Sequence, residues 1–217
     1  MPSYLKLCFA YCAIFPKGHK IIKDDLIRQW VSLGFSTWQL GERYISQLLG
    51  FSFLEHSKSP STMKLYDEDI TLLTMHDLVH DLARLVMDDE ILVVGEGGNT
   101  EGSWYRYALL DDCSKPLGLE SSKIRALRFM DCDKIELHHA AFSSAKSLRV
   151  LDLSECIIHK LPDSIGVLKQ LRYLNAPRVQ DALIPNDIAR SQSYCTLTFM
   201  GLLKSWFYQN PLEKLKV

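Results

Sequence analysis

The residues best suited to chemistry lie together at 74–83, Thr-Met-His-Asp-Leu-Val-His-Asp-Leu-Ala. His76 and His80 are four residues apart, so on a helix both imidazoles could hold one zinc ion, with Asp77 where zinc peptidases carry glutamate. A zinc site needs a third ligand, and no histidine follows at a recognisable short spacing. Paired His-Asp dipeptides also occur in metal-dependent phosphohydrolases, but those need further His and Asp ligands on several helices. We therefore expect no metal and no enzyme activity.

The same segment has the pattern of an amphipathic helix and its start. Thr74 is a candidate N-cap, and Asp77, three residues on, lies where a capping-box acid belongs. His76 then lies beside unpaired backbone N–H groups at the positive end of the helix dipole, a position that favours an anion such as phosphate. The alternative is a solvated cap without a ligand. An apolar stripe follows at helical spacing, made of Leu78, Leu82, Leu85 and Val86.

Composition limits the remaining classes of function. Of the 217 residues, 47% are hydrophobic, enough for a sizeable core, and the net charge of −1 gives no basic field for nucleic acid or anionic lipid. No apolar run is long enough to span a membrane, so we expect no stable membrane insertion. The six cysteines are scattered without a C-x-x-C pair, which favours a reduced cytoplasmic compartment. They are Cys8, Cys12, Cys113, Cys132, Cys156 and Cys195.

The first 90 residues have the order of a winged helix. Apolar spacing predicts a helix from Leu5 to Cys12, a second from about Asp24 to a C-cap at Gly34, and a third over 37–49. Alternation at Phe51 and Phe53, a polar loop at 57–62 and an extended run at 70–75 then predict a hairpin. Winged helices often bind DNA through the third helix, which then needs several cations. Here the long polar side chains of that helix are Glu42, Arg43 and Gln47, so only one of them is a cation. DNA binding is therefore the alternative, not the leading reading.

A second module follows an acidic, glycine-containing boundary at 88–104. Residues 148–158 match the leucine-rich-repeat pattern L-x-x-L-x-L-x-x-C-x-I at every fixed position. Equivalent apolar positions recur 24 residues upstream, from Ile124, and 23 residues downstream, at Leu171 and Leu174. Tyr194, Leu197 and Phe199 could form a degenerate further strand, whereas Trp206 to Tyr208 fit no repeat and suggest an aberrant end.

Arginines align across these repeats. On the strand face presumed exposed, Arg125, Arg149 and Arg172 recur at one position and form a possible basic stripe for an acidic partner, the alternative being a solvated ladder. The other positions expected to be exposed on that face are Ala126, Arg128, Val150, Asp152, Tyr173 and Asn175.

Several segments resemble plant nucleotide-binding leucine-rich-repeat immune receptors of the coiled-coil type. They are Leu5-Lys6-Leu7-Cys8-Phe9-Ala10-Tyr11-Cys12-Ala13-Ile14-Phe15-Pro16-Lys17-Gly18, Leu26-Ile27-Arg28-Gln29-Trp30, Gly34-Phe35 and Met75-His76-Asp77. The resemblance is close over residues 2–87. It implies that His76 approaches the β-phosphate of bound ADP in the resting receptor and that Asp77 braces the helix start.

The family's phosphate-binding loop is absent, since Gly95-Glu96-Gly97-Gly98 is followed by no Gly-Lys-Ser/Thr. We therefore expect ADP or ATP to bind only in an intact receptor, and this chain, beginning inside the signature, to be a truncated product. The implied function is the regulatory, autoinhibitory part of a disease resistance receptor. Its implied partners are the missing nucleotide-binding domain and, through the repeats, a pathogen effector or host guard protein.

The sequence thus predicts an α+β fold, a winged helix followed by a short α/β leucine-rich-repeat solenoid. The expected winged-helix subdomain covers residues 1–90, and a linker with the first strand covers 91–120. Leucine-rich repeats cover 121–217 and degenerate after about 190.

Overall fold

The computed structural model describes residues 1–57, 70–93, 105–110, 123–130, 142–181 and 196–198. The chain forms two compact units, residues 1–88 and 89–217, which are described in turn. The first combines helices with a small antiparallel sheet and the second is built around a parallel sheet, so the fold is α+β.

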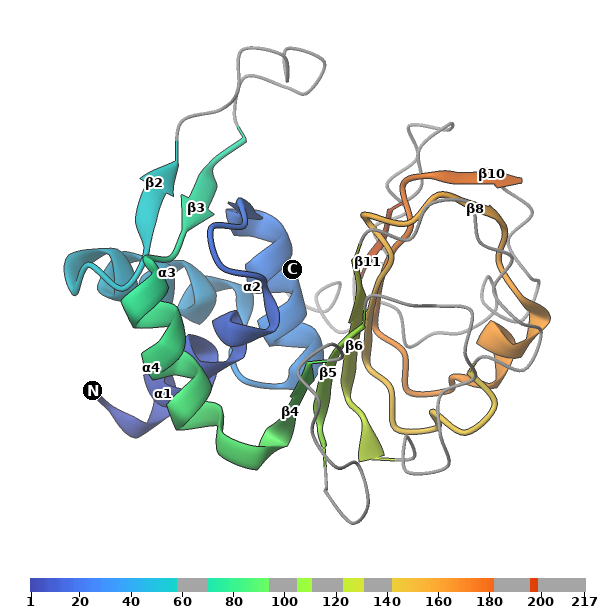
Figure 1. The fold of residues 1–217 in the computed structure, drawn as a ribbon, viewed down its shortest axis with the longest axis horizontal. Helices are drawn as coiled ribbons and strands as arrows, with labels where there is room; N and C mark the ends of the chain where they lie inside the picture. The colour runs from blue at the N-terminus through green and yellow to red at the C-terminus, as the bar shows by residue number, and fades with distance from the viewer. Residues whose placement is uncertain (58–69, 94–104, 111–122, 131–141, 182–195, 199–217) are drawn as a thin grey trace, which may run out of the picture. The chain divides into compact units, whose positions relative to one another are not determined.

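The helices of the first unit lie close to their predicted positions (Figure 1). Helix α2 ends at Gly34, whose φ of +82° is a left-handed C-cap that glycine adopts without strain. Helix α3 starts after Thr37, whose side chain accepts a hydrogen bond from the backbone N–H of Leu40 at 3.4 Å. The helical elements are α1 (Ser3–Tyr11), η1 (Cys12–Ile14), α2 (Lys23–Leu33), α3 (Trp38–Gly50) and α4 (Asp77–Met87).

These helices share one core. Fully buried side chains come from all parts of the unit, including Phe9 of α1, Trp30 of α2 and Leu48 of α3. Helices α2 and α3 pack closely at Gly41, where an added Cβ would lie 2.6 Å from Cγ2 of Ile27. Glycine at this position therefore permits the helix contact, and alanine would push the two helices apart.

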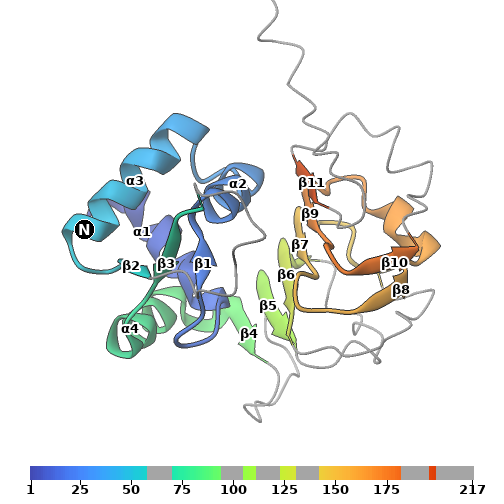
Figure 2. The ribbon, with the colours of Figure 1, turned by 90° about the horizontal axis from the view of Figure 1, so that it is seen from above.

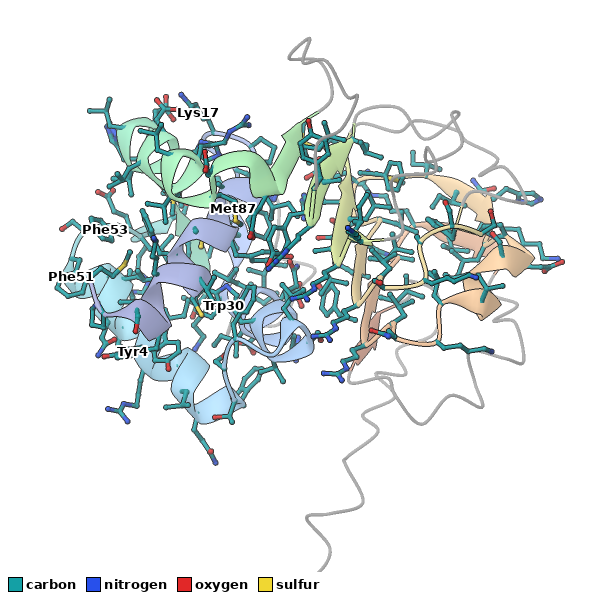
Figure 3. All side chains as sticks on the ribbon, turned by 90° about the horizontal axis from the view of Figure 1, so that it is seen from below. Tyr4, Lys17, Trp30, Phe51, Phe53 and Met87 are labelled. Carbon is teal, nitrogen blue, oxygen red and sulfur yellow. The ribbon has the colours of Figure 1, made fainter. Side chains whose placement is uncertain are left out.

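The hairpin is shorter than predicted. Its strands β2 (Glu55–Ser57) and β3 (Leu72–Thr74) pair antiparallel, with His56 opposite Leu73, and β1 (Ile21–Ile22) pairs along the other edge of β3. The first strand does not begin at Phe51, because the chain turns there and Ser52 has a φ of +55°. The Phe51 and Phe53 rings instead contact each other, at a centroid distance of 5.9 Å (Figure 3).

The second unit contains a six-stranded parallel sheet in the order β11-β9-β7-β6-β5-β4 (Figure 2). The register aligns Ala126, Val150, Tyr173 and Thr196, so successive strands from β6 on begin 24, 23 and 23 residues apart. Leu197 pairs with Leu174, as expected of a further strand in register. The strands are β4 (Ile91–Val93), β5 (Tyr107–Leu110), β6 (Ala126–Phe129), β7 (Val150–Asp152), β9 (Tyr173–Asn175) and β11 (Thr196–Thr198).

Each strand carries one apolar row into a common core. Leu127, Leu151 and Leu174 are fully buried at one register level, and Cys156 is buried at the turn after β7. The return segments between strands hold η4 (Asp163–Val167) and a two-stranded parallel sheet of β8 (Ile158–Lys160) and β10 (Val179–Asp181), whereas η2 (Asp88–Glu90) lies between α4 and β4. Within 91–120, expected to be a linker and one strand, the structure has both β4 and β5.

The opposite face of the sheet differs from the prediction. Six positions expected to be exposed are buried, while Arg125, Arg149 and Arg172 are half-buried. Two of the polar members compensate each other, because the buried Arg128 guanidinium pairs with the carboxylate of Asp152 on the next strand. The six are Ala126, Arg128, Val150, Asp152, Tyr173 and Asn175.

Some predicted features lie outside the described residues. They are the hairpin loop from 58 to 62, the glycine-rich stretch 95–98, three of the cysteines (Cys113, Cys132 and Cys195) and the segment after 198 with Trp206 to Tyr208.

Candidate functional site

The first turn of α4 places His76 at the surface. His76 has an extended backbone (φ −64°, ψ 145°) and is the N-cap of the helix, and its Nδ1 accepts a hydrogen bond from the N–H of Leu78 at 3.3 Å. The predicted N-cap, Thr74, was wrong because that residue ends strand β3, where it pairs with Glu55. Asp77 is exposed in the first helical turn, where its charge suits the helix dipole.

The capping bond fixes what the imidazole can do. A ring nitrogen that accepts a hydrogen bond carries no proton, so the neutral ring holds its proton on Nε2. Nε2 is then a hydrogen-bond donor on an exposed side chain, next to the open N–H groups of a helix start. This arrangement suits an oxyanion such as a phosphate oxygen better than a metal ion, which requires a ring nitrogen without a proton.

His80, one turn further, has a structural position. The residue is 6% exposed, and Nε2 lies 2.7 Å from the carbonyl oxygen of Phe15, 65 residues away in sequence. Since a carbonyl only accepts, Nε2 of His80 donates this bond. His76 and His80 therefore do not converge, and no group of three potential metal-binding side chains occurs among the residues that the structure describes.

A second contact fixes the same loop to α4. The ammonium of Lys17 lies 2.6 Å from the carboxylate of Asp81 (Figure 3). The hydrogen bond from Lys17 holds the pKa of Asp81 below its ordinary value. Together with the bond between His80 and Phe15, this ion pair ties the start of α4 to the chain after α1. Sequence reasoning missed both contacts, which join residues more than 60 positions apart and leave no local pattern.

Comparison with known proteins shows which proteins this chain is similar to. Residues 14–83 match the winged-helix domain of disease resistance proteins, a match that includes α2, α3, the hairpin and His76. The chain is a relative of plant disease resistance proteins. It is 26% identical to RPP13-like protein 1 of Arabidopsis thaliana over 91% of its length and 29% identical to disease resistance protein RGA2 of Solanum bulbocastanum over 77%. Disease resistance protein PIK6-NP of Oryza sativa subsp. japonica is 27% identical over 91% of the chain.

The chain spans a small part of these disease resistance proteins. It covers 20% of RPP13-like protein 1, 16% of RGA2 and 20% of PIK6-NP. None of the helices in the described parts of the chain is both long and apolar enough to cross a membrane.

The structure of the winged helix in this chain gives no support to the DNA-binding alternative. Helix α3 presents Arg43 as an exposed cation, but Glu42 is engaged by Lys23 at 3.2 Å and Thr37 caps the helix. Trp38 is the first residue of α3, and the guanidinium carbon of Arg28 lies over its ring, 5.7 Å from the ring centroid. One free cation falls short of the series of phosphate contacts that DNA binding requires.

The leucines of the apolar stripe predicted on α4 are exposed. Leu78 and Leu85 are 75% and 78% exposed, and Leu82 is 43% exposed. The buried side of α4 is formed by His80, Ala83 and Met87. Helical periodicity correctly located the apolar side of α4, but that side is not the one that packs on the described core of this unit.

Proposed function

We propose that the chain is the regulatory switch region of a plant immune receptor, in which His76 donates a hydrogen bond to the β-phosphate of ADP. The observation that carries the proposal is the capping geometry, with Nδ1 bonded to the N–H of Leu78 and Nε2 left as an exposed donor. The principal nucleotide pocket would lie on a separate nucleotide-binding domain, the partner that the family resemblance implies. The chain itself then has no catalytic role and holds no nucleotide alone.

The second unit fits a short leucine-rich-repeat solenoid. Three observations support this interpretation. Successive strands begin 24, 23 and 23 residues apart, they pair in parallel, and they bury leucines at one register level. In this proposal the repeats hold the receptor in its resting state and contact a pathogen effector or a host guard protein. Recognition would release the winged helix, allow nucleotide exchange and start oligomerisation.

A cytoplasmic location completes the proposal. The described cysteines Cys8, Cys12 and Cys156 are free and buried thiols. Burial raises the pKa of the Cys8 thiol to about 12, so it remains protonated at neutral pH. Free thiols in place of disulfides suit a reducing compartment.

The proposal is tested by retention of ADP. The 217-residue chain is added to an isolated, ADP-loaded nucleotide-binding domain from a plant immune receptor of the resembled family, and release of labelled ADP is followed. We expect the chain to slow release by about tenfold or more, because a hydrogen bond to a charged group contributes about 1.5–3 kcal/mol. The His76→Asn variant retains a side chain that caps helices but lacks the imidazole, so we expect it to lose most of this effect.

The control is His159→Ala, which removes an exposed histidine on β8 in the other unit and should behave as the wild type. Equal ADP release with the wild-type chain and with His76→Asn would reject the proposed phosphate contact.

A further inference from the structure

A continuous series of hydrogen bonds connects His76 to the chain after α1. Nε2 of His80 donates to the carbonyl oxygen of Phe15 at 2.7 Å, and the backbone N–H of His80 donates to the carbonyl oxygen of His76 at 2.9 Å. The N–H of Leu78 then donates to Nδ1 of His76 at 3.3 Å. The imidazole of His76 is exposed, yet it is linked in this way to a buried contact one turn along the helix.

Phe15 gives the series a fixed end. The residue is 4% exposed, and its ring lies edge-on to the ring of Tyr11 at a centroid distance of 6.5 Å. The Tyr11 hydroxyl in turn donates to the side-chain oxygen of Gln29 on α2, at 2.7 Å. Because Tyr11 and Gln29 are also buried, the carbonyl of Phe15 is fixed to the core of the first unit. A hydrogen bond to this carbonyl holds α4 on that core.

The turn that follows brings Lys17 to the same part of α4. The chain turns at 16–19, where the N–H of the fourth residue donates to the carbonyl oxygen of the first at 3.1 Å. Gly18 has a φ of +70°, which glycine adopts in such a turn without strain. Lys17 precedes it, and its ammonium reaches the carboxylate of Asp81 at 2.6 Å (Figure 3). We call this ion pair and the bond from His80 the α4 tether.

Apolar side chains give α4 a limited attachment to its own unit. His80, Ala83 and Met87 are buried, and Val79 and Val86 are half-buried. The leucines, which carry the largest apolar side chains of the helix together with its methionine, are exposed. Since burial of apolar area is what normally holds a helix on a core, the tether contributes a larger share here than it would beside buried leucines.

We propose that His80 and Lys17 are positioning residues for His76, and that release of the tether withdraws the imidazole from the phosphate. The inference rests on the proposed function of His76 and adds the device that holds its contact in place. Energetic coupling between two positions travels through continuous networks of hydrogen bonds and packed side chains. The receptor then loses ADP through a displacement of α4, with His76 itself unchanged.

Hydrogen exchange of the whole chain, followed by NMR, tests the tether without nucleotide. His80→Leu leaves the buried carbonyl of Phe15 without its donor, so the amides of α4 should exchange about tenfold faster while those of α2 change little. His80→Gln retains a side-chain N–H donor and should restore most of the protection.

A second variant tests the tether at the surface, where the core is not disturbed. Lys17→Glu replaces the exposed ion pair with two like charges, and it should speed exchange of the α4 amides a few-fold. Lys17→Glu combined with Asp81→Lys restores opposite charges and should reverse the effect. Lys6→Glu, at an exposed lysine of α1, is the matched control and should leave α4 unchanged.

Unchanged exchange of the α4 amides in both His80→Leu and Lys17→Glu would reject the tether. Equal acceleration in α2 and α4 would assign His80 to the stability of the whole unit and would also overturn the proposal.

Release of ADP from the nucleotide-binding domain tests the positioning role. We expect the His80→Leu chain to allow release about as fast as the His76→Asn chain does, and the His80→Gln chain to slow release nearly as well as the wild type. Faster exchange in α4 with wild-type retention of ADP would reject the positioning role and leave the contact of His76 intact. A wild-type chain that does not slow release would instead reject the proposed function, and with it the link from the tether to ADP.

Discussion

Receptors in which His76 is replaced by alanine are expected to signal without a pathogen. In a receptor that carries the upstream domains, losing the proposed phosphate contact should lower ADP affinity by about tenfold to a hundredfold, from about 1.5–3 kcal/mol. The resting state would then lose its nucleotide and open. Spontaneous cell death in a leaf expression assay is the measurement, and Asp77→Val should act in the same direction more weakly, since a first-turn acid contributes about 0.3–1 kcal/mol.

The same assay can separate the phosphate contact from the helix cap. Alanine at position 76 removes both the imidazole and the acceptor for the N–H of Leu78. Asparagine keeps a capping side chain and removes only the imidazole. We expect His76→Asn to activate as strongly as His76→Ala. Activation by alanine alone would assign the effect to the cap, and loss of ADP without any signalling would reject the resting-state role.

The largest effect on stability is expected at Arg128. Arg128 is 4% exposed, and its guanidinium bonds to Asp152 on the neighbouring strand and to Glu155 at 2.8 Å. Burial opposes its charge, but the two carboxylates outweigh this and keep the pKa of Arg128 above its ordinary value. Arg128→Ala would leave Asp152 buried without its cation, and we expect a loss of about 3–5 kcal/mol in urea unfolding followed by circular dichroism.

A double variant checks the cause of that loss. Arg128→Leu combined with Asp152→Leu removes both buried charges and should recover most of the stability. Arg178→Ala, at an exposed arginine of the same unit, should change little. A loss for Arg128→Ala of under about 1 kcal/mol, typical of an exposed pair, would contradict the buried ion pair.

Local patterns predicted local structure well. Gly34 and Thr37 marked the end of α2 and the start of α3 because their effects depend on neighbouring backbone groups. The N-cap of α4 was misplaced by two residues, since strand pairing of Thr74 outcompeted its capping preference. A rule based on neighbouring residues cannot detect a strand partner contributed from elsewhere in the chain.

Contacts over long sequence distances explain the remaining differences. The spacing of Leu78 and Leu85 indicates which side of α4 is apolar, but not whether that side is covered. His80 can be buried because its Nε2 donates a hydrogen bond to the carbonyl oxygen of Phe15, which no spacing within α4 could indicate. Arg128 was expected to be exposed because alternation places it opposite the leucines, whereas its burial depends on acids 24 and 27 residues later.

The most direct measurement is nitrogen NMR of His76 in the ¹⁵N-histidine-labelled chain. We expect the neutral imidazole to carry its proton on Nε2 and none on Nδ1, the nitrogen that accepts from the N–H of Leu78. We further expect a shift of the Nε2 resonance when an ADP-loaded nucleotide-binding domain is added, but not when ADP alone is added. A proton on Nδ1, or an Nε2 resonance that the ADP-loaded domain leaves unchanged, would contradict the proposed contact with the phosphate.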